Sequence, residues 1–485
     1  MLQRNNPMNK KRLLILMVLL AGCTLAPKYD RPEAPVPKTW PSGPSYQDTK
    51  QAPQASQLPW RDFITDPRLR EVIAVALANN RDLRVTGLNV EKAKAMFGIN
   101  RASLLPIVNA TGNWYQERVP ADLSSSGKIY TAEKYSVNLG LAAWEIDFFG
   151  RIRSLKDAAL EQYLATDEAR RSAQILLVAT VTQAYLALAA DREALQLVAS
   201  TLEAQEAAYN MIRKRHEVGM ASELDLRRSQ TQVETARGDV ARYTQLVAQD
   251  ENGLNLLVGS SVRPDLLPRD LSGVTLPRDI SAGLSSDVLL GRPDVLAAEH
   301  FLKAANANIG AARAAFFPSI SLTGTIGSGS VQLDNLFTGP NRTWSFMPQI
   351  SIPLFNWGAN KAGLDLTRVR KEISVTQYEQ AVQDAFQDVS DVLVANATLK
   401  QQYASQLKGT NAELDRNRLM QMRVDHGIAD SLTMLDSQRQ SYAAQLTLLG
   451  VQQQWINSRV DLYKVLGGGL KAYQDGQVKQ NPAAE

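Results

Sequence analysis

The sequence predicts an α+β membrane protein that arose by internal duplication, with a β-hairpin and very long helices in each half. Three observations indicate this fold class. Glycine-centred motifs recur 208 residues apart, two pairs of short segments alternate apolar and polar residues on either side of a loop, and helical segments of about sixty residues follow them. A duplication means that the two halves share one structural plan, and the spacing of apolar residues along the sequence distinguishes strands from helices.

The duplication is clearest at two turns centred on Gly219 and Gly427. The stretch that begins at Met211 reads MIRKRHEVGMASELDLRRSQ, and the stretch that begins at Gln421 reads QMRVDHGIADSLTMLDSQRQ. When the glycines are aligned, an arginine, a leucine and a Ser-Gln pair coincide, and no gap is needed. The same spacing relates two further glycine pairs, Gly150 with Gly358 and Gly259 with Gly467.

Charge and cysteine content exclude several classes of protein. Of 485 residues, 53 are Lys or Arg and 49 are Asp or Glu, and the net charge of +4 is carried by basic residues ahead of Cys23. The rest of the chain is balanced, so nothing favours a nucleic-acid partner. A single cysteine excludes an intrachain disulfide and a metal site with several cysteine ligands.

Residues 1–22 are typical of a secretory signal peptide. A basic cluster precedes the apolar run 13–20, which is too short to span a bilayer as a helix. The sequence Leu-Ala-Gly-Cys that ends at Cys23 resembles the lipobox of bacterial lipoproteins, so Cys23 is the expected acylated N-terminus; the alternative is an ordinary cysteine. Residues 23–65, rich in Pro, Ser and Gln, are expected to form an extended tether that leads away from the lipid.

The first repeat is predicted over residues 66–260. Asp66 is the expected N-cap and Pro67 the first residue of a helix that runs to about Leu104. Alternating apolar residues then predict a β-hairpin over about 107–144, with small residues that suit a barrel wall facing lipid.

Two helices and a turn complete the first repeat. A helix over about 155–217 leads to the turn near Gly219, and its apolar run 175–190 is interpreted as buried helix because it is short and contains polar residues. The returning helix, about 222–258, has apolar residues every seven positions, which indicates a coiled-coil seam.

The second repeat, residues 286–468, follows a linker at 261–285 and has the same plan. Its first helix begins at Pro293, its hairpin covers about 319–354, and its long helix, about 361–425, leads to a turn near Gly427. Residues 469–485 form a C-terminal tail.

One copy of the chain cannot complete the predicted sheet. Each repeat supplies two strands, and an open sheet edge is not tolerated in hydrocarbon. Four strands are too few for a barrel, two copies would give eight, and three would give twelve, which leaves a lumen. Closure by a symmetric homotrimer is therefore expected.

The lipobox, the duplicated hairpin-and-long-helix plan and the R…G…L…SQ turns resemble the TolC-like outer membrane factor family, most closely its lipoprotein branch typified by OprM. The resemblance covers the chain from Cys23 to Gly469. It implies a trimeric 12-stranded β-barrel, four strands per protomer, continuous with a long α-helical coiled-coil tunnel in the periplasm. It also implies the outer membrane of a Gram-negative cell and passive export of drugs and small toxic compounds. The implied partners are a periplasmic adaptor and an inner-membrane RND-type transporter.

The resemblance further implies a gate at the periplasmic end of the tunnel. Asp436 matches a gate aspartate of the family, and Leu432 one turn earlier would add an apolar ring. Arg439 can pair with Asp436 or with an acid on a neighbouring helix. Asp225 matches an acid that latches neighbouring helices. Thr433 stands where TolC has a second aspartate, so a single acidic ring is expected. The alternative is an ordinary solvated pair on a helix.

The residues at the two turns are candidate contacts for the adaptor. They are Val218, Gly219, Met220, Ala221, His426, Gly427, Ile428 and Ala429. The simpler interpretation, a helix C-cap in which glycine supplies a positive φ, is compatible with that role.

No catalytic, cofactor-binding or metal-binding motif is recognised, and an enzyme is not expected. The three histidines, His216, His300 and His426, are interpreted as surface residues. Two alternatives to drug efflux stay open, an exit duct for metal-ion efflux or type I secretion and, more remotely, a non-conducting lipid-anchored coiled-coil spacer. The spacer has no need of alternating strands.

Overall fold

The computed structural model describes residues 24–46, 53, 55, 58–283, 285–428 and 431–469, without the side chains of Ser431 and Leu432. The predicted signal peptide, Cys23, Ala429 and the tail after Gly469 lie outside the described residues. The chain divides into two compact units, each assembled from separate stretches. We call them the strand unit (up to Glu33, Asn89–Thr166 and Ala297–Tyr378) and the turn unit (Ala34–Leu88, Asp167–Leu296 and from Glu379 onward).

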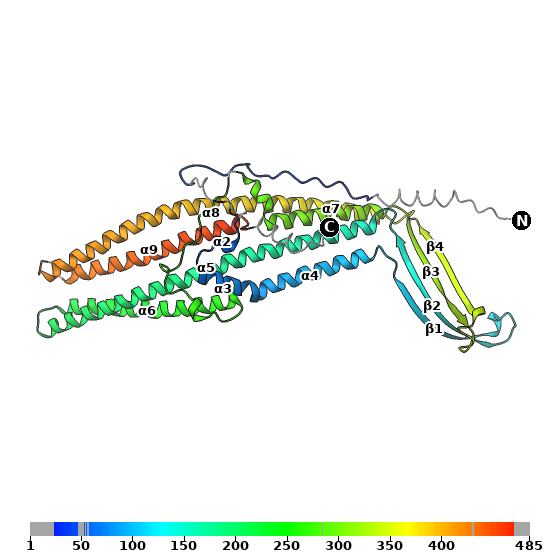
Figure 1. Ribbon diagram of the computed structural model, residues 1–485, viewed down its shortest axis with the longest axis horizontal. Helices are drawn as coiled ribbons and strands as arrows, with labels where there is room; N and C mark the ends of the chain where they lie inside the picture. Colours follow the sequence, from blue (N-terminus) through cyan, green and yellow to red (C-terminus); the bar gives the residue numbers. More distant parts are fainter. Residues whose placement is uncertain are drawn as a thin grey trace. The chain divides into compact units, whose positions relative to one another are not determined.

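The strand unit contains one antiparallel sheet in the order β1-β2-β3-β4 (Figure 1). Its strands are β1 Val108–Val119, β2 Tyr130–Ile146, β3 Ser319–Ser330 and β4 Arg342–Ser351. The pairs β1–β2 and β3–β4 lie where the alternating patterns predict hairpins, and β2 pairs with β3 to join the two repeats. β2 bulges between Leu141 and Trp144, where Ala143 has a φ of 48°.

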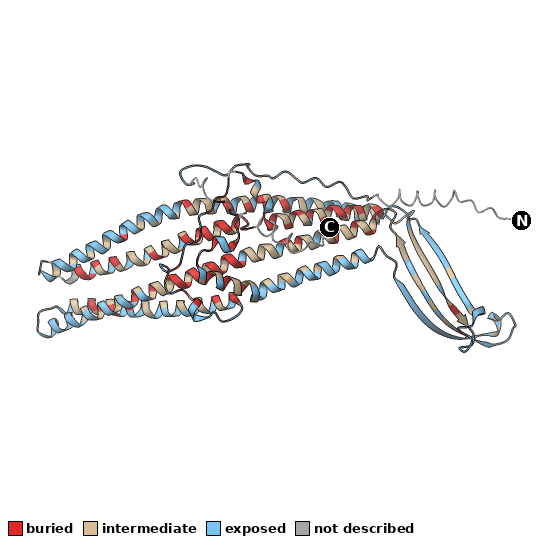
Figure 2. Ribbon diagram, in the orientation of Figure 1, coloured by how far each residue is buried: buried red, intermediate tan, exposed pale blue. Residues whose placement is uncertain are grey.

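The two edge strands are the most exposed parts of the sheet. Almost every residue of β1 and β4 is exposed, whereas most residues of β2 and β3 are half-buried (Figure 2). Large apolar side chains project from β4, where Trp344 is 79 % exposed and Phe346 and Ile350 are also exposed. Within the described residues β1 pairs only with β2 and β4 only with β3, so both outer edges lack partners.

The long helices have the lengths that a duplication requires. α5 (Arg151–Glu217) and α8 (Ala359–Asp425) each have 67 residues and begin and end 208 residues apart. The returning helices are α6 (Glu223–Val258) and α9 (Ser431–Val465). All six glycines of the aligned pairs have φ between 69° and 84°. Both repeats therefore turn the backbone left-handed at the same three points, where glycine costs least.

The heptad prediction for α6 is confirmed by burial. The positions Val233 and Leu254 and the intervening Ala236 are buried, and Val240 and Val247 are half-buried. These residues form the seam against neighbouring helices of the turn unit.

The prediction of one helix from Pro67 to Leu104 is wrong, because Asn80 divides it. Asp66 caps α3 (Pro67–Asn79) as expected, accepting hydrogen bonds from the N–H groups of Arg68 and Leu69. Asn80 then has a ψ of 129°, outside the helical range, and its Oδ1 accepts from Leu83 N at 2.8 Å. It thereby caps a new helix, α4 (Arg81–Ala102), while its Nδ2 donates to Leu257 O at 2.8 Å. The corresponding helix in the second repeat, α7 (Pro293–Ala314), begins at Pro293 as predicted.

The core of the turn unit lies around the middle of α5. Tyr185 is fully buried and donates to Leu266 O in the linker at 3.0 Å, and Phe63 stacks on Tyr463 at 4.2 Å between ring centroids. Among the described helices only α5 contains an 18-residue window apolar enough to cross a membrane, and 56 % of that window is buried. The buried interpretation of 175–190 is confirmed at ten positions, among them Val181, Tyr185 and Leu188.

The first residues of the predicted tether are docked on the protein, a contact that their composition does not indicate. Residues 24–31, the N-terminal strap, lie along α7 of the strand unit. Arg313 donates to Leu25 O at 3.0 Å and Asn306 to Pro27 O at 2.8 Å, while Gly310 leaves no room for a Cβ beside the backbone of Ala26. The strap is therefore extended, as its composition predicts, but docked.

The strap is fixed by one buried carboxylate, that of Glu299, which is 3 % exposed. Arg31 donates to it from Nε at 3.0 Å and Nη2 at 2.6 Å, Tyr29 from its hydroxyl at 3.1 Å, and Lys303 pairs with it at 3.1 Å. Burial alone would raise the pKa of Glu299, but the bonds from Arg31 and Lys303 outweigh it, so the pKa lies below its usual value.

Candidate functional site

The first turn connects α5 to α6 through a left-handed glycine. Gly219 has a φ of 79°, its N–H donates to His216 O, and Met220 N donates to Arg215 O at 2.7 Å. These bonds satisfy the last carbonyls of α5. The side chains of Val218 and Met220 have no packing role there, since about 70 % of each is exposed.

Asp225 caps a helix in addition to any role as a latch. Its N–H donates to Ser222 Oγ at 3.1 Å, and its carboxylate accepts from Ser222 N at 3.3 Å, which is a reciprocal capping box. His216 closes the turn by contacts with Ala221 O at 3.0 Å and Glu223 Oε2 at 3.2 Å. The Ser-x-x-Asp spacing is the signal in the sequence that could have identified this cap.

The second turn repeats the backbone bonds of the first. Gly427 has a φ of 69°, and Ile428 N donates to Arg423 O at 2.8 Å, the equivalent of the bond from Met220 to Arg215. Ile428 is exposed, and His426 contacts Met422 O at 2.7 Å through Nδ1. The side chain of Leu432 and all of Ala429 lie outside the described residues.

The predicted pair of Asp436 and Arg439 is confirmed. Arg439 Nη2 lies 2.8 Å from Asp436 Oδ1, and Gln440 Nε2 donates to Asp436 Oδ2 at 2.7 Å. Both charged side chains are largely exposed, so water screens their attraction and the pair contributes little to stability. Their exposure leaves them available for contacts outside the protomer.

Asp436 and Arg439 lie on the wall of a groove of about 360 Å³ in the turn unit. The other walls come from α5 and α6 and include Arg228. Two hydrogen bonds join α9 to those helices at the groove: Gln205 Nε2 donates to Gln438 Oε1 at 3.1 Å, and the Tyr442 hydroxyl donates to Asp239 Oδ2 at 2.9 Å.

The tyrosine of that groove is held in its neutral form. Burial, followed by the bond to Asp239, raises the pKa of Tyr442. Gln205, Asp239 and Tyr442 were not predicted, because the recurring motifs show which residues are equivalent in the two repeats but not which residues contact each other. The recurring Ser-Gln pair, which includes Gln438, was the only signal.

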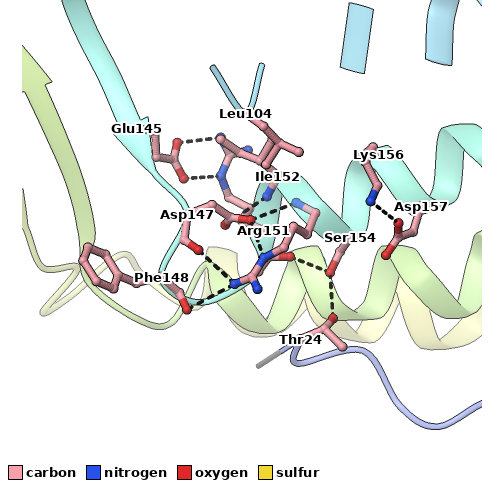
Figure 3. A network of polar contacts seen from close by, with 12 residues as sticks. Thr24, Leu104, Glu145, Asp147, Phe148, Arg151, Ile152, Ser154, Lys156 and Asp157 are labelled. Atoms are coloured by element: carbon pink, nitrogen blue, oxygen red, sulfur yellow. Dashed lines mark hydrogen bonds and ion pairs between the residues drawn. The ribbon is translucent and has the colours of Figure 1, made fainter. Parts of the chain in front are cut away.

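A second polar cluster lies where β2 passes into α5 (Figure 3). Asp147 accepts from the backbone N–H groups of Ile152 at 3.2 Å and Arg153 at 2.9 Å and thereby caps α5. Arg151 forms a bidentate pair with Glu145 at 2.8 and 2.6 Å, and this bonding raises the pKa of the Arg151 guanidinium. Thr24 of the strap contacts Ser154 at 3.4 Å in the same corner.

His300 is not a surface residue, contrary to expectation. Its side chain is only 17 % exposed and lies 2.6 Å from Glu161 Oε2 on α5. Within the described residues no group of three His, Cys, Asp or Glu side chains is arranged to hold a metal ion.

A duplicated chain with an open apolar sheet and long coiled-coil helices has the plan expected of an outer-membrane channel protein. The family model of the outer membrane efflux protein matches residues 72–260 and 284–468. The chain therefore belongs to the outer membrane efflux protein family, and the predicted TolC-like membership is confirmed. It is an efflux channel of the outer membrane, in a family of channels rather than enzymes.

Relatives match nearly the whole chain. The toluene efflux pump outer membrane protein TtgC of Pseudomonas putida is 47 % identical over 480 residues, 98 % of this chain and 99 % of TtgC. OprJ of Pseudomonas aeruginosa is 41 % identical over 457 residues, 94 % of this chain and 95 % of OprJ. The open-state crystal structure of the MtrE outer membrane channel of Neisseria gonorrhoeae has a TM-score of 0.84 at 39 % identity and covers 92 % of this chain and 99 % of MtrE.

Proposed function

We propose that three copies of this chain form one 12-stranded β-barrel that continues into a helical tunnel. The observation that carries the proposal is the four-stranded sheet, which has an apolar face and two edges without a partner strand among the described residues. Each unpaired N–H or C=O would be costly in hydrocarbon, so β4 of one copy must pair with β1 of the next. Two copies would give a barrel filled by side chains, whereas three leave a lumen.

Two helices that lie partly in the strand unit support the same closure. None of the 22 residues of α4, all of which are described, is buried, and Met96 and Ile99 expose about half or more of their surface. α8 exposes Leu366, Val369 and Ile373 at helical spacing. Apolar stripes on two different helices fit a head-to-tail contact between copies, which closes into a ring.

The proposed cargo is drugs and other small toxic compounds, conducted passively. The relatives TtgC and ArpC, each 47 % identical, are named for toluene and antibiotic efflux pumps. A periplasmic adaptor and an inner-membrane RND-type transporter would deliver the cargo. These names favour drug efflux over the alternatives of metal-ion efflux and type I secretion.

The proposed gate is a ring of Asp436 and Leu432 from three copies, with Arg439 as the partner of Asp436. Convergent carboxylates attract cations and repel one another. Asp225 is proposed to help latch the helices through the cap that it forms with Ser222. The exposed residues of the two turns, from Val218 to Ala221 and from His426 to Ala429, are the proposed adaptor contacts.

Acylation of Cys23 is the proposed second attachment to the outer membrane. The strap supports this, because Thr24 lies at the corner where β2 meets α5, next to the sheet that would span the bilayer. Cys23→Ser should abolish acylation in a mass measurement of the mature protein, while the barrel still inserts. Acylated protein in this variant would assign the lipid to another residue.

Single-channel recording in planar bilayers tests the conducting trimer. Purified full-length protein should form trimers by native mass spectrometry and open large channels, and a strain that lacks it should become sensitive to toluene and antibiotics. A monomeric protein, or trimers without conductance, would reject the barrel and favour a non-conducting spacer.

A further inference from the structure

The corner between β2 and α5 also contains a cavity that conduction does not explain. It measures about 230 Å³ and lies within the strand unit. Its walls come from the end of β2, the start of α5, the end of α7 and the strand ends next to them. Glu145, Asp147, Phe149, Arg151 and Phe317 are among the residues that line it.

The polar wall of the cavity carries both signs of charge. Arg151 uses its Nε and Nη2 on Glu145, and its Nη1 makes no hydrogen bond within the part of the chain that the structure describes. The side chain is 42 % exposed, so these N–H groups can reach a ligand. Each oxygen of Glu145 accepts one bond from Arg151 and retains a lone pair. The wall therefore offers donors for an anion and, beside them, acceptors for an ammonium group.

Part of the lining is aromatic. Phe149 stacks on Phe317 with 4.8 Å between ring centroids. Beyond the cavity the surface stays apolar, because Phe316, Leu354 and Phe355 are exposed on the segments that join the sheet to the helices. At about 230 Å³ the cavity is smaller than the roughly 300–1,000 Å³ of a drug-sized site, which suits a small polar group whose apolar remainder lies outside.

We infer that this corner binds the headgroup of a zwitterionic phospholipid that carries a phosphate and a primary ammonium. The phosphate lies on Arg151 Nη1, the ammonium lies on the Glu145 carboxylate, and the acyl chains follow the apolar surface of the sheet. The inference rests on the proposed function, since only a sheet that lies in the bilayer brings this corner to the level of the headgroups.

The second repeat lacks the charges and supplies an internal control. The positions 208 residues after Glu145 and Arg151 are Pro353 and Ala359, and the only matching cation is Lys361, which corresponds to Arg153. Lys361 is exposed at the start of α8. Lys361→Gln therefore removes the same charge as Arg151→Gln from a corner without the carboxylate partner.

Native mass spectrometry of the full-length protein in detergent tests the site with phosphatidylethanolamine, phosphatidylcholine and phosphatidylglycerol at equal concentrations. Phosphatidylethanolamine should be retained best, because choline has no N–H donor and glycerol has no positive charge. Arg151→Gln should lower its retention by roughly tenfold or more, as expected for the loss of a charged hydrogen bond, whereas Lys361→Gln should retain it as the wild type does. Glu145→Gln should remove the preference for ethanolamine over choline without lowering the retention of phosphatidylglycerol.

Three results would overturn the inference: equal retention of the ethanolamine and choline lipids, stronger retention of phosphatidylglycerol, or equal losses in Arg151→Gln and Lys361→Gln. The oligomer mass and the thermal transition, measured on the same samples, show whether each variant is folded. If Arg151→Gln does not fold, the loss of the ethanolamine preference in Glu145→Gln tests the inference by itself. Conductance separates the two proposals. A protein that conducts but retains no ethanolamine lipid refutes the headgroup site and leaves the channel intact.

Discussion

The left-handed glycines at the turns provide a direct test of the fold. Gly219 has a φ of 79°, and no neighbour lies within 4 Å of the position that a Cβ would take, so the conformation and not steric crowding opposes a side chain there. Gly238, in the middle of α6, also has open space around it but has ordinary helical geometry. The same substitution, Gly→Ala, should therefore have opposite effects at these two positions.

The expected magnitudes follow from the backbone alone. A left-handed alanine costs about 1–2 kcal/mol, and the restriction of the unfolded chain returns about 0.4–1 kcal/mol, so Gly219→Ala should destabilise the turn by about 1 kcal/mol. Gly238→Ala should stabilise α6 by about 1 kcal/mol, because alanine is the better helix former. The difference of about 2 kcal/mol corresponds to roughly 30-fold in a local opening constant.

Hydrogen–deuterium exchange of the full-length protein measures both effects. The amide of Met220, bonded to Arg215 O at 2.7 Å, should exchange faster in Gly219→Ala. The amides around residue 238 should exchange more slowly in Gly238→Ala. Gly427→Ala should reproduce the first result, because its φ is 69°. Slower exchange in Gly219→Ala, or the same change at both positions, would refute the left-handed turn.

Three further predictions concern the gate, the strap and the returning helix. The double variant Asp436→Ala and Leu432→Ala should raise single-channel conductance. The control Asp415→Ala should not, although it also removes an exposed carboxylate that pairs with an arginine three residues later. Unchanged conductance in a double variant that assembles normally would reject the gate. Glu299→Gln should release the strap and expose residues 24–31 to proteases. Because the pKa of Glu299 is lowered, acid should release the strap of the wild type as the pH falls below the ordinary carboxyl range, and a strap equally protected in both proteins would contradict this. Burial, together with the neighbouring Asp191, raises the pKa of Asp250 to about 6. The native state therefore keeps this proton at pH values where the unfolded chain has lost it, and the free energy of unfolding should fall as the pH rises from about 4 to about 6. Asp250→Asn should flatten this dependence in thermal unfolding, and an unaltered profile would show that Asp250 is not its source.

The large-scale plan could be predicted because it depends on local periods and on glycine. Alternation indicated both hairpins, and the recurring glycines located the turns at Gly219 and Gly427, since few other residues adopt a positive φ there. The pair of Asp436 and Arg439 was also predictable, because residues three apart on a helix are always neighbours.

The features that were not predicted depend on contacts between distant parts of the chain, or on residues that are compatible with more than one local structure. Asn80 is tolerated inside a helix, and only its bond to Leu257 O decides that it caps a new one. The strap has the composition of a free linker, but Glu299 supplies a buried partner 268 residues after Arg31. The bond between Asp239 and Tyr442 joins the two repeats and leaves no trace in either.

The equal length of α5 and α8 constrains how such a chain can evolve. One inserted residue would lengthen a helix by about 1.5 Å and rotate everything beyond it by about 100°, which would shift the heptad seam out of phase and move one turn but not its counterpart. Natural variation in length should therefore accumulate in the loops between strands and in the linker. Where the helices do change, whole heptads should be gained or lost in α5, α6, α8 and α9 together.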